Sequence, residues 1–196
     1  MSKKVKEFIV PVITLVAISS ISAYMLGFVH DVTFDAIQKA KDNKELKAIS
    51  EVVNEFDNDP FAEKTTIMTK NKKHKLIMYP ARNNGKLTSV AIKSYTNTGF
   101  GGKIEVMTGF NVSGSIKTFK IISSNETPGL GSKVDEPKFK DQLTDFYPHH
   151  QILKVKQDGG DIDAVTAATI SSRAVLRAIE RAYDAFSNFN SGGDNE

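Results

Sequence analysis

The chain contains no cysteine, which excludes several classes of protein at once. Disulfide scaffolds, cysteine-ligated zinc sites, protein-bound iron–sulfur clusters and thiol nucleophiles all require that residue. Its absence leaves the compartment open, because a protein without cysteine is at home in any redox environment. A hydrophobic fraction of 40% is too high for intrinsic disorder and too low for a protein with many membrane spans. The 196 residues therefore suit one domain of medium size, with or without an appendage.

Charged residues are missing from the whole segment between Phe8 and Val29. A helix of this length spans roughly 33 Å, which is enough to cross the hydrocarbon core of a bilayer. Three lysines precede the segment, whereas His30 and Asp31 follow it. This asymmetry predicts that the N-terminus is cytoplasmic and that residues 30–196 lie on the far side of the membrane.

Two other interpretations of this segment are a cleaved signal peptide and a buried helix of a soluble protein. The apolar stretch is longer than is usual for a signal peptide, and Ile21-Ser22-Ala23 is a poor cleavage site. We therefore expect a retained anchor. The expected parts of the chain are a cytoplasmic N-terminus (1–7), a transmembrane helix (8–29), an extracytoplasmic domain (30–188) and a flexible tail (189–196).

The net charge of +3 first points to an acidic partner, but the distribution of the charges weakens that argument. Residues 3–7 contain three lysines and one glutamate and so contribute +2, which leaves only +1 for the remainder. A nearly neutral exported domain is not expected to bind nucleic acid. The run KNKKHK at 70–75 is a local exception, and we interpret it as a solvated turn between strands rather than a functional patch.

Hydrophobic spacing predicts helix from Val32 to about Val53. Lys41-Asp42-Asn43 interrupts the pattern, so one helix and two short helices are both open. The region from Thr65 to Ser124 is typical of strands, with turn residues between them. The expected strands are 75–79 (closed by Pro80), 86–96, 103–112 and 115–123, with turns at Asn83-Asn84-Gly85 and Ser113-Gly114.

Two patterns define the expected core. In the strand at 103–112, alternate residues point to one side of the sheet: Ile104, Val106, Thr108 and Phe110. The last element, from Ser172 to about Asn188, is a strong helix with the apolar stripe Val175, Ile179, Ala182 and Phe186. The fold class is therefore α+β, an antiparallel sheet flanked by helices, with one N-terminal transmembrane helix.

The first motif is Thr98-Gly99-Phe100-Gly101-Gly102, which leads into the strand at 103–112. Closely spaced glycines allow the backbone to approach a planar ligand or to form a bulge. On its own the cluster is more typical of an ordinary turn at the start of a strand.

The second motif is Glu126-Thr127-Pro128-Gly129-Leu130-Gly131-Ser132-Lys133. Pro-Gly suits the two central positions of a type II turn, where glycine adopts a positive φ. Such a loop can offer backbone N–H groups to a polar ligand edge while Leu130 covers an apolar ring. It is not a P-loop, because the GxxxxGK[ST] spacing is absent. A structural turn and a ligand loop are equally open on these grounds.

The third motif, DAVTAATISS at 163–172, runs directly into the last helix. Small residues and hydroxyls at a helix N-terminus form a ready phosphate site, because the first N–H groups are free and the dipole favours an anion. The simpler interpretation is a serine or threonine cap.

These three motifs, in this order, resemble the covalent FMN-binding domain family. That domain occurs in the G subunit of the Rnf electron-transport complex and in the C subunit of the sodium-pumping NADH:quinone oxidoreductase. The resemblance covers nearly the whole chain, including the single N-terminal anchor. In this family the last threonine of Asp-x-x-(Ser/Thr)-Gly-Ala-Thr carries FMN through a phosphoester bond formed by a separate flavin transferase. The matching residue is Thr169, with Asp163 and Thr166 at the earlier positions.

The chain departs from the family pattern at Ala167, where glycine is commoner. Because alanine disfavours a positive φ, we expect a turn that is compatible with negative φ here. The resemblance implies that the phosphate rests against the N–H groups of Ser171 and Ser172, with Arg173 pairing with its charge. The isoalloxazine would then reach the 126–131 loop. The expected cofactor-binding residues are Glu126, Thr127, Gly129, Leu130, Gly131, Thr166, Ala168, Thr169, Ser171, Ser172 and Arg173.

The resemblance implies a membrane-anchored flavoprotein subunit that relays electrons in an ion-translocating ferredoxin:NAD oxidoreductase (Rnf) complex. Its partners would be the other membrane subunits, and it would have no catalytic activity of its own. The C subunit of the sodium-translocating NADH:quinone oxidoreductase is the near alternative, and the short chain favours Rnf. A non-redox binding or assembly module of the same fold is also open.

The expected location is the bacterial cytoplasmic membrane, with a single pass and the C-terminal domain on the periplasmic side. No catalytic residues and no metal site are expected. The adjacent His149 and His150 diverge, and no carboxylate cluster is evident near them in the sequence.

Overall fold

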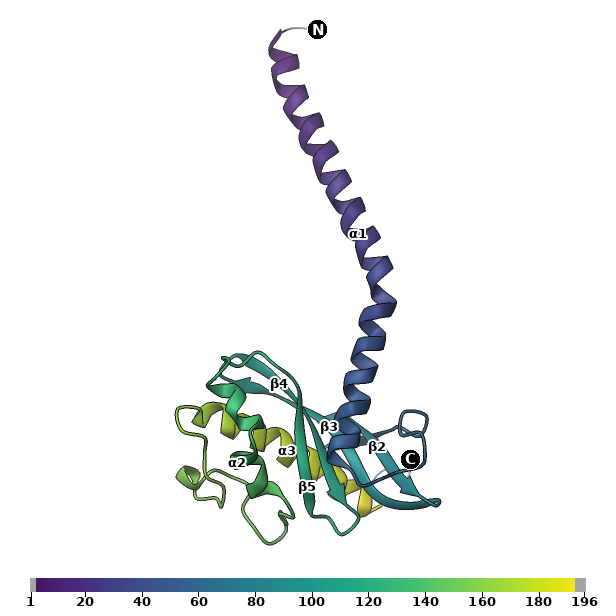
Figure 1. Ribbon diagram of the computed structural model, residues 1–196. Helices are drawn as coiled ribbons and strands as arrows, with labels where there is room; N and C mark the ends of the chain where they lie inside the picture. Colours follow the sequence, from purple (N-terminus) through teal and green to yellow (C-terminus); the bar gives the residue numbers. More distant parts are fainter. Residues whose placement is uncertain (1–2, 193–196) are drawn as a thin grey trace. The chain divides into compact units, whose positions relative to one another are not determined.

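The computed structural model describes residues 3–192 (Figure 1). The long elements are α1 (Lys3–Val52), β1 (Thr65–Met68), β2 (Lys75–Asn83), β3 (Lys86–Gly99), β4 (Gly102–Asn111), β5 (Ile116–Ser124) and α3 (Thr169–Asn190). Between β5 and α3 lie the short helices η1 (Gly131–Asp135), α2 (Pro137–Lys140), η2 (Asp141–Leu143) and η3 (Lys156–Asp158). The chain forms two compact units, which meet between Asn43 and Lys44.

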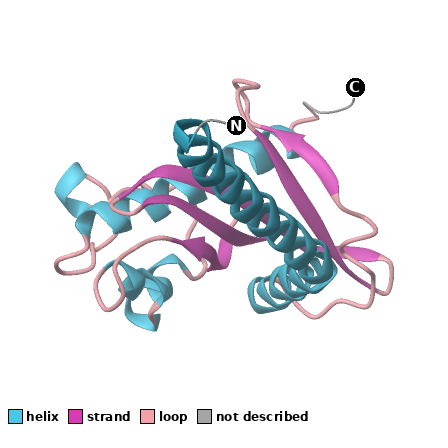
Figure 2. Ribbon diagram, turned by 90° about the horizontal axis from the view of Figure 1, so that it is seen from above, coloured by secondary structure: helices cyan, strands magenta, loops and turns pink. Residues whose placement is uncertain are grey.

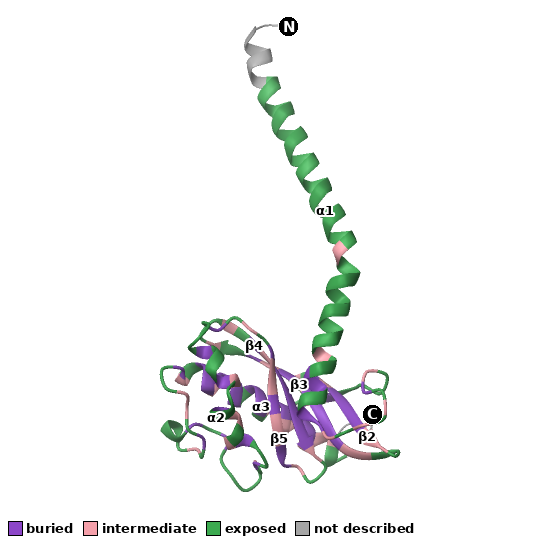
Figure 3. Ribbon diagram, in the orientation of Figure 1, coloured by how far each residue is buried: buried purple, intermediate pink, exposed green. Residues whose placement is uncertain are grey.

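Helix α1 is continuous, and its large apolar side chains between Ile9 and Val32 are exposed (Figure 3). Within the described chain it is the one helix that is long and apolar enough to cross a membrane, by length and composition alone. Lys41-Asp42-Asn43 does not break it, so this region is one helix, where the sequence left one helix or two short helices open. None of these three residues is glycine or proline, so keeping each of them helical costs less than about 1 kcal/mol.

The five strands form one sheet in the order β1-β2-β3-β4-β5, and every neighbouring pair is antiparallel. Figure 2 shows the strands in magenta. The expected turn at Asn83-Asn84-Gly85 is confirmed. Asn84 and Gly85 have φ values of 49° and 75°. A two-residue hairpin turn of type I′ requires a positive φ at both central residues. The α+β class, an antiparallel sheet flanked by helices, is therefore confirmed.

Strand β2 does not end at Pro80, as the sequence predicts, but continues to Asn83. Strand β1 pairs with β2 only as far as Met78, so Pro80 lies at an open edge of the sheet. Proline is tolerated there because the edge has no partner strand that needs its missing N–H. The run at 70–75 lies at and beside the turn between β1 and β2, as expected.

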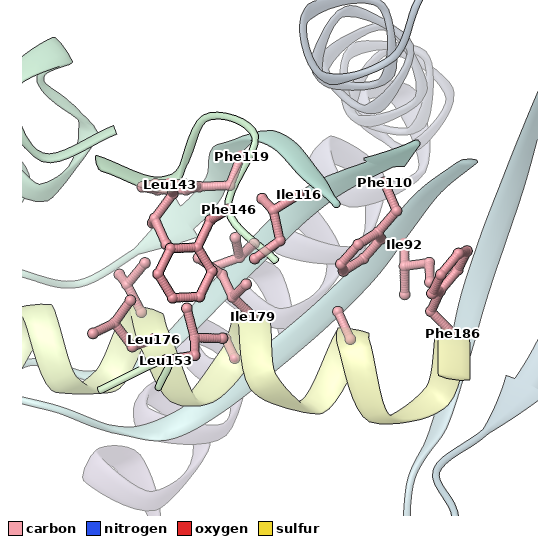
Figure 4. Close-up of a cluster of buried hydrophobic side chains, with 14 of the residues drawn as sticks. Ile92, Phe110, Ile116, Phe119, Leu143, Phe146, Leu153, Leu176, Ile179 and Phe186 are labelled. Carbon is pink, nitrogen blue, oxygen red and sulfur yellow. The ribbon is translucent and has the colours of Figure 1, made fainter. Parts of the chain in front are cut away.

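Helix α3 packs on one face of the sheet and encloses the larger core (Figure 4). Its predicted apolar stripe is confirmed, since Val175, Ile179, Ala182 and Phe186 are all buried. Phe110 of β4 stacks on Phe186, with ring centroids 5.0 Å apart and an angle of 12° between the ring planes. The alternating side of β4 faces this core, as predicted.

The opposite face of the sheet is also buried, which the alternation in β4 does not indicate. The end of α1 covers it with Ala48, Ile49 and Val52. Gly109 permits this close approach, because a Cβ atom there would lie 1.8 Å from the Val52 carbonyl oxygen. The sheet is therefore the middle layer of a unit with helices on both faces.

Candidate functional site

The three motifs meet at one cleft of about 360 Å³. The turn between β3 and β4 contributes Phe100. The loop after β5 contributes Glu126, Thr127, Leu130 and Gly131, and the start of α3 with the two residues before it contributes residues 167–171. These segments are far apart in the sequence, and the antiparallel register brings them together. Strand β4 begins beside the end of β5, since Ile104 pairs with Ser124.

Thr169 is the first residue of α3 and is half-buried in this cleft. The helix starts three residues earlier than the sequence predicts. Its first backbone hydrogen bond runs from the Ser172 N–H to the Ala168 carbonyl at 2.9 Å. The N–H groups of Thr169, Ile170 and Ser171 therefore have no acceptor within the helix, and the positive end of the helix dipole lies at Thr169. This arrangement suits a phosphate attached to the Thr169 hydroxyl.

The loop before α3 differs from expectation at Ala167, which has a φ of +64°. We expected a negative φ, because the left-handed region costs an ordinary residue roughly 1–2 kcal/mol. The Ser172 hydroxyl explains how the loop is held: it accepts the Val165 N–H at 3.0 Å and donates to the Ala168 carbonyl at 3.0 Å. The loop therefore keeps the conformation that the commoner glycine adopts easily.

The second motif forms the expected turn. Its Leu130 N–H donates to the Thr127 carbonyl at 3.2 Å, and Gly129 has a φ of +77°. These are the features of a type II turn with Pro128 and Gly129 at its centre. The turn leaves Leu130 46% exposed at the cleft.

The glycine cluster is more than a turn at the start of a strand. The Gly101 N–H donates to Glu126 Oε1 at 3.0 Å, and a Cβ atom on Gly101 would lie 1.9 Å from the Asn125 carbonyl oxygen. The turn therefore packs directly on the loop of the second motif. At its tip Phe100 is 72% exposed and lines the cleft, a role that our sequence reasoning missed. An exposed aromatic residue between glycines was the available signal.

Glu126 is only 7% exposed, and both of its carboxylate oxygens are engaged. Oε1 accepts the Gly101 N–H, and Oε2 accepts the Ser171 hydroxyl. Its carboxylate thus joins the glycine turn to the first turn of α3.

Four expected cofactor residues do not line this cleft, namely Gly129, Thr166, Ser172 and Arg173. Ser172 uses its N–H and its hydroxyl within the loop and helix, so it has no free donor for a phosphate. Arg173 forms a two-pronged hydrogen bond with Asp158 at 2.7 Å and lines a different cleft with Arg177. The Arg173 guanidinium lowers the pKa of the Asp158 carboxyl below its usual value. Thr166 is exposed and also lies outside the Thr169 cleft.

Thr166 lines a second cleft of about 230 Å³, together with Lys133, Phe139 and Gln142. Gln142 holds the start of the third motif: it accepts the Asp163 N–H at 2.7 Å and donates to the Asp163 carbonyl at 3.2 Å. The third motif therefore runs between two clefts, with Thr166 on one and Thr169 on the other.

The chain is similar to several known proteins. The FMN-binding domain family matches residues 99–184. The G subunit of the ion-translocating oxidoreductase complex of Vibrio atlanticus is 30% identical over 172 residues, covering 82% of this chain and 81% of that protein. The G subunit from Shewanella oneidensis is 32% identical over 172 residues, covering 81% and 79%. The crystal structure of Shewanella oneidensis NqrC has a TM-score of 0.50 and 21% identity, covering 76% and 73%, and shares the fold.

The fold and the cleft thus define an FMN-binding domain. The chain belongs to the family formed by the G subunits of ion-translocating oxidoreductase complexes.

Proposed function

We propose that this chain is a membrane-anchored flavoprotein subunit that relays electrons through FMN within an ion-translocating oxidoreductase complex. The family supports this role, and the observation that carries it is the position of Thr169. Thr169 carries a hydroxyl and is the first residue of α3 in the lining of the cleft, where the first N–H groups of the helix have no helical acceptor.

The cleft fits FMN in its chemistry as well as its size. The first turn of α3 suits the phosphate, and Phe100, Leu130 and Ile170 offer exposed apolar surface to an aromatic ring. A volume of about 360 Å³ falls within the usual range of small-molecule sites, roughly 300–1,000 Å³. FMN would supply reversible electron transfer when bound, while the residues that line the cleft would hold it and tune its potential.

The attachment that we propose is a phosphoester between the Thr169 Oγ and the FMN phosphorus. A threonine hydroxyl is a weak nucleophile, so a separate flavin transferase is required. A flavin dinucleotide is a suitable donor, because its pyrophosphate bond is activated. The Thr169 Oγ–P bond forms, the P–O–P bond of the donor breaks, the hydroxyl proton is lost and the nucleoside monophosphate leaves.

Helix α1 is the proposed anchor. Its exposed apolar side chains between Ile9 and Val32 are unfavourable in water and suit a bilayer, and the lysines that precede this apolar segment favour a cytoplasmic N-terminus. The domain that carries Thr169 would then lie on the periplasmic side, with the other membrane subunits of the complex as its partners. Identities of 30–32% to these G subunits favour a ferredoxin:NAD (Rnf) complex over the quinone-linked sodium pump.

The test is co-expression of the full chain with a flavin transferase. The wild type should show flavin fluorescence in a denaturing gel and an intact mass raised by one FMN less one water. Thr169→Ala should lose both signals. Thr144→Ala is the matched control, because Thr144 is exposed and lies outside the cleft; it should keep them.

Equal fluorescence in the wild type and Thr169→Ala would show that Thr169 is not the attachment site. A wild type that binds no flavin, covalently or otherwise, would contradict the redox role and favour the non-redox module.

A further inference from the structure

Glu126 is a buried carboxylate at the wall of the cleft, and the chain itself occupies both of its oxygens. The Gly101 N–H and the Ser171 hydroxyl each donate to it. Both oxygens accept hydrogen bonds, which is the pattern of an ionised carboxylate, because a protonated carboxyl group has a donor O–H at one of its oxygens. Glu126 is therefore a charged residue of the wall rather than a free ligand for a cofactor.

Two glycines of the motifs are explained by this carboxylate. A Cβ atom on Gly99 would lie 2.5 Å from Glu126 Oε1, and a Cβ atom on Gly131 would lie 2.6 Å from Glu126 Oε2. Real Cβ atoms do not approach an oxygen so closely. The glycine cluster and the Gly-Leu-Gly segment thus both leave room for the same side chain.

The charge of Glu126 is balanced by dipoles alone. Among the residues that the structure describes, no lysine or arginine forms an ion pair with it. Its neighbours are an N–H group, a hydroxyl and the N-terminal turn of α3, which stabilise a negative charge without cancelling it. Because the carboxylate is shielded from water, its field extends into the cleft more strongly than that of a surface carboxylate.

From these contacts we infer that Glu126 is a positioning residue that also sets the potential of the site. It fixes the glycine turn, the 126–131 loop and the start of α3 relative to one another. It also keeps a negative charge beside an electron carrier attached to Thr169, which lowers the reduction potential of that carrier. Accepting an electron adds negative charge to the carrier, and a fixed negative charge nearby opposes this. The inference rests on the proposed function for its second half only.

The experiment compares midpoint potentials of the flavin-bearing full chain in detergent, by spectroelectrochemical titration. Glu126→Gln removes the charge but keeps the shape, with an amide that can accept from Gly101 and donate to Ser171. Its potential should rise relative to the wild type. Glu180→Gln is the matched control, since Glu180 is an exposed carboxylate on α3 outside this cleft, and its potential should stay at the wild-type value.

Ser171→Ala gives a second test that does not depend on the folding of Glu126→Gln. It removes one donor from the carboxylate and leaves the charge in place, so the potential should stay equal or fall. A rise in Ser171→Ala, or an unchanged potential in Glu126→Gln, would overturn the assignment of the potential to this charge.

The positioning role has a readout that needs no flavin, namely thermal unfolding of the unmodified chain. Glu126→Ala should lower the Tm clearly, whereas Glu126→Gln should stay near the wild type and Glu180→Ala should leave it unchanged. A Glu126→Ala variant as stable as the wild type would contradict the positioning role. A wild-type protein that carries no flavin would overturn the proposed function and the role of Glu126 in the potential. The stability comparison would still test the positioning role of Glu126.

Discussion

Val165 donates its backbone N–H to the hydroxyl of Ser172 at 3.0 Å, which closes the loop before α3 onto the first turn of that helix. Ser172 is fully buried, and the same hydroxyl donates to the Ala168 carbonyl. This pair holds the segment that carries Ala167 and sets the position of Thr169. The position of Thr169, the proposed attachment residue, therefore depends on the buried Ser172 side chain.

Replacing Ser172 with alanine should reduce the free energy of unfolding by about 1–3 kcal/mol, because the Val165 N–H loses its acceptor. Chemical denaturation followed by circular dichroism measures this. Ser123→Ala is the control, since Ser123 is exposed on β5 and should change stability little. Equal stability of the two variants would show that the Val165 bond does not contribute.

Ala167→Gly should stabilise the domain by about 0.5–1 kcal/mol. Glycine removes the cost of the +64° φ, roughly 1–2 kcal/mol, and adds a smaller entropic cost of about 0.5–1 kcal/mol. Ala164→Gly is the matched control, because Ala164 has no positive φ and should only lose stability. If both substitutions destabilise the domain, the strain at Ala167 is not significant.

Gly109→Ala should destabilise the unit that begins at Lys44 by about 1–3 kcal/mol. The added Cβ would lie 1.8 Å from the Val52 carbonyl oxygen, so the end of α1 must move off the sheet. Differential scanning calorimetry of the full chain measures the loss. Gly27→Ala meets no atom within 4 Å and should leave this transition unchanged.

The stability of the domain should fall as the pH drops below about 6.5, the ordinary pKa of histidine. Burial lowers the pKa of His74, and Arg181 and Lys73 lower it further. The unfolded chain therefore binds the proton more readily than the folded one, and the stability that His74 contributes is lost on acidification. His74→Asn should flatten the dependence of unfolding free energy on pH between about 7 and 5, whereas His149→Asn, at an exposed histidine, should not.

Local patterns predicted much of the fold. The apolar stripe of α3 and the Asn84-Gly85 turn are encoded within a few residues, by helical spacing and by side chains that tolerate a positive φ. The burial of the second face of the sheet was not predicted, because along β4 only Met107 on that side is a large apolar residue, between Glu105 and Gly109. The close packing at Gly109 depends on Val52, which lies more than fifty residues earlier in the chain.

The candidate site was likewise predicted only in part from the sequence. The order of the motifs predicted that the 126–131 loop and Thr169 belong together, and they line one cleft. Spacing could not predict the direction of Arg173, because its partner Asp158 lies on a separate short helix. Nor could it assign Glu126 to the wall, since that depends on hydrogen bonds from Gly101 and Ser171.

The order of the strands determines the stage of folding at which the candidate site forms. Each strand pairs with its neighbour in the sequence, so the sheet can assemble progressively as the chain is synthesised. Helix α3 follows all five strands in the sequence and supplies 8 of the 25 buried residues of the larger core. The Thr169 hydroxyl is thus among the last groups of the domain to reach its place, and the proposed flavin transferase would find the complete cleft only after α3 has packed on the sheet.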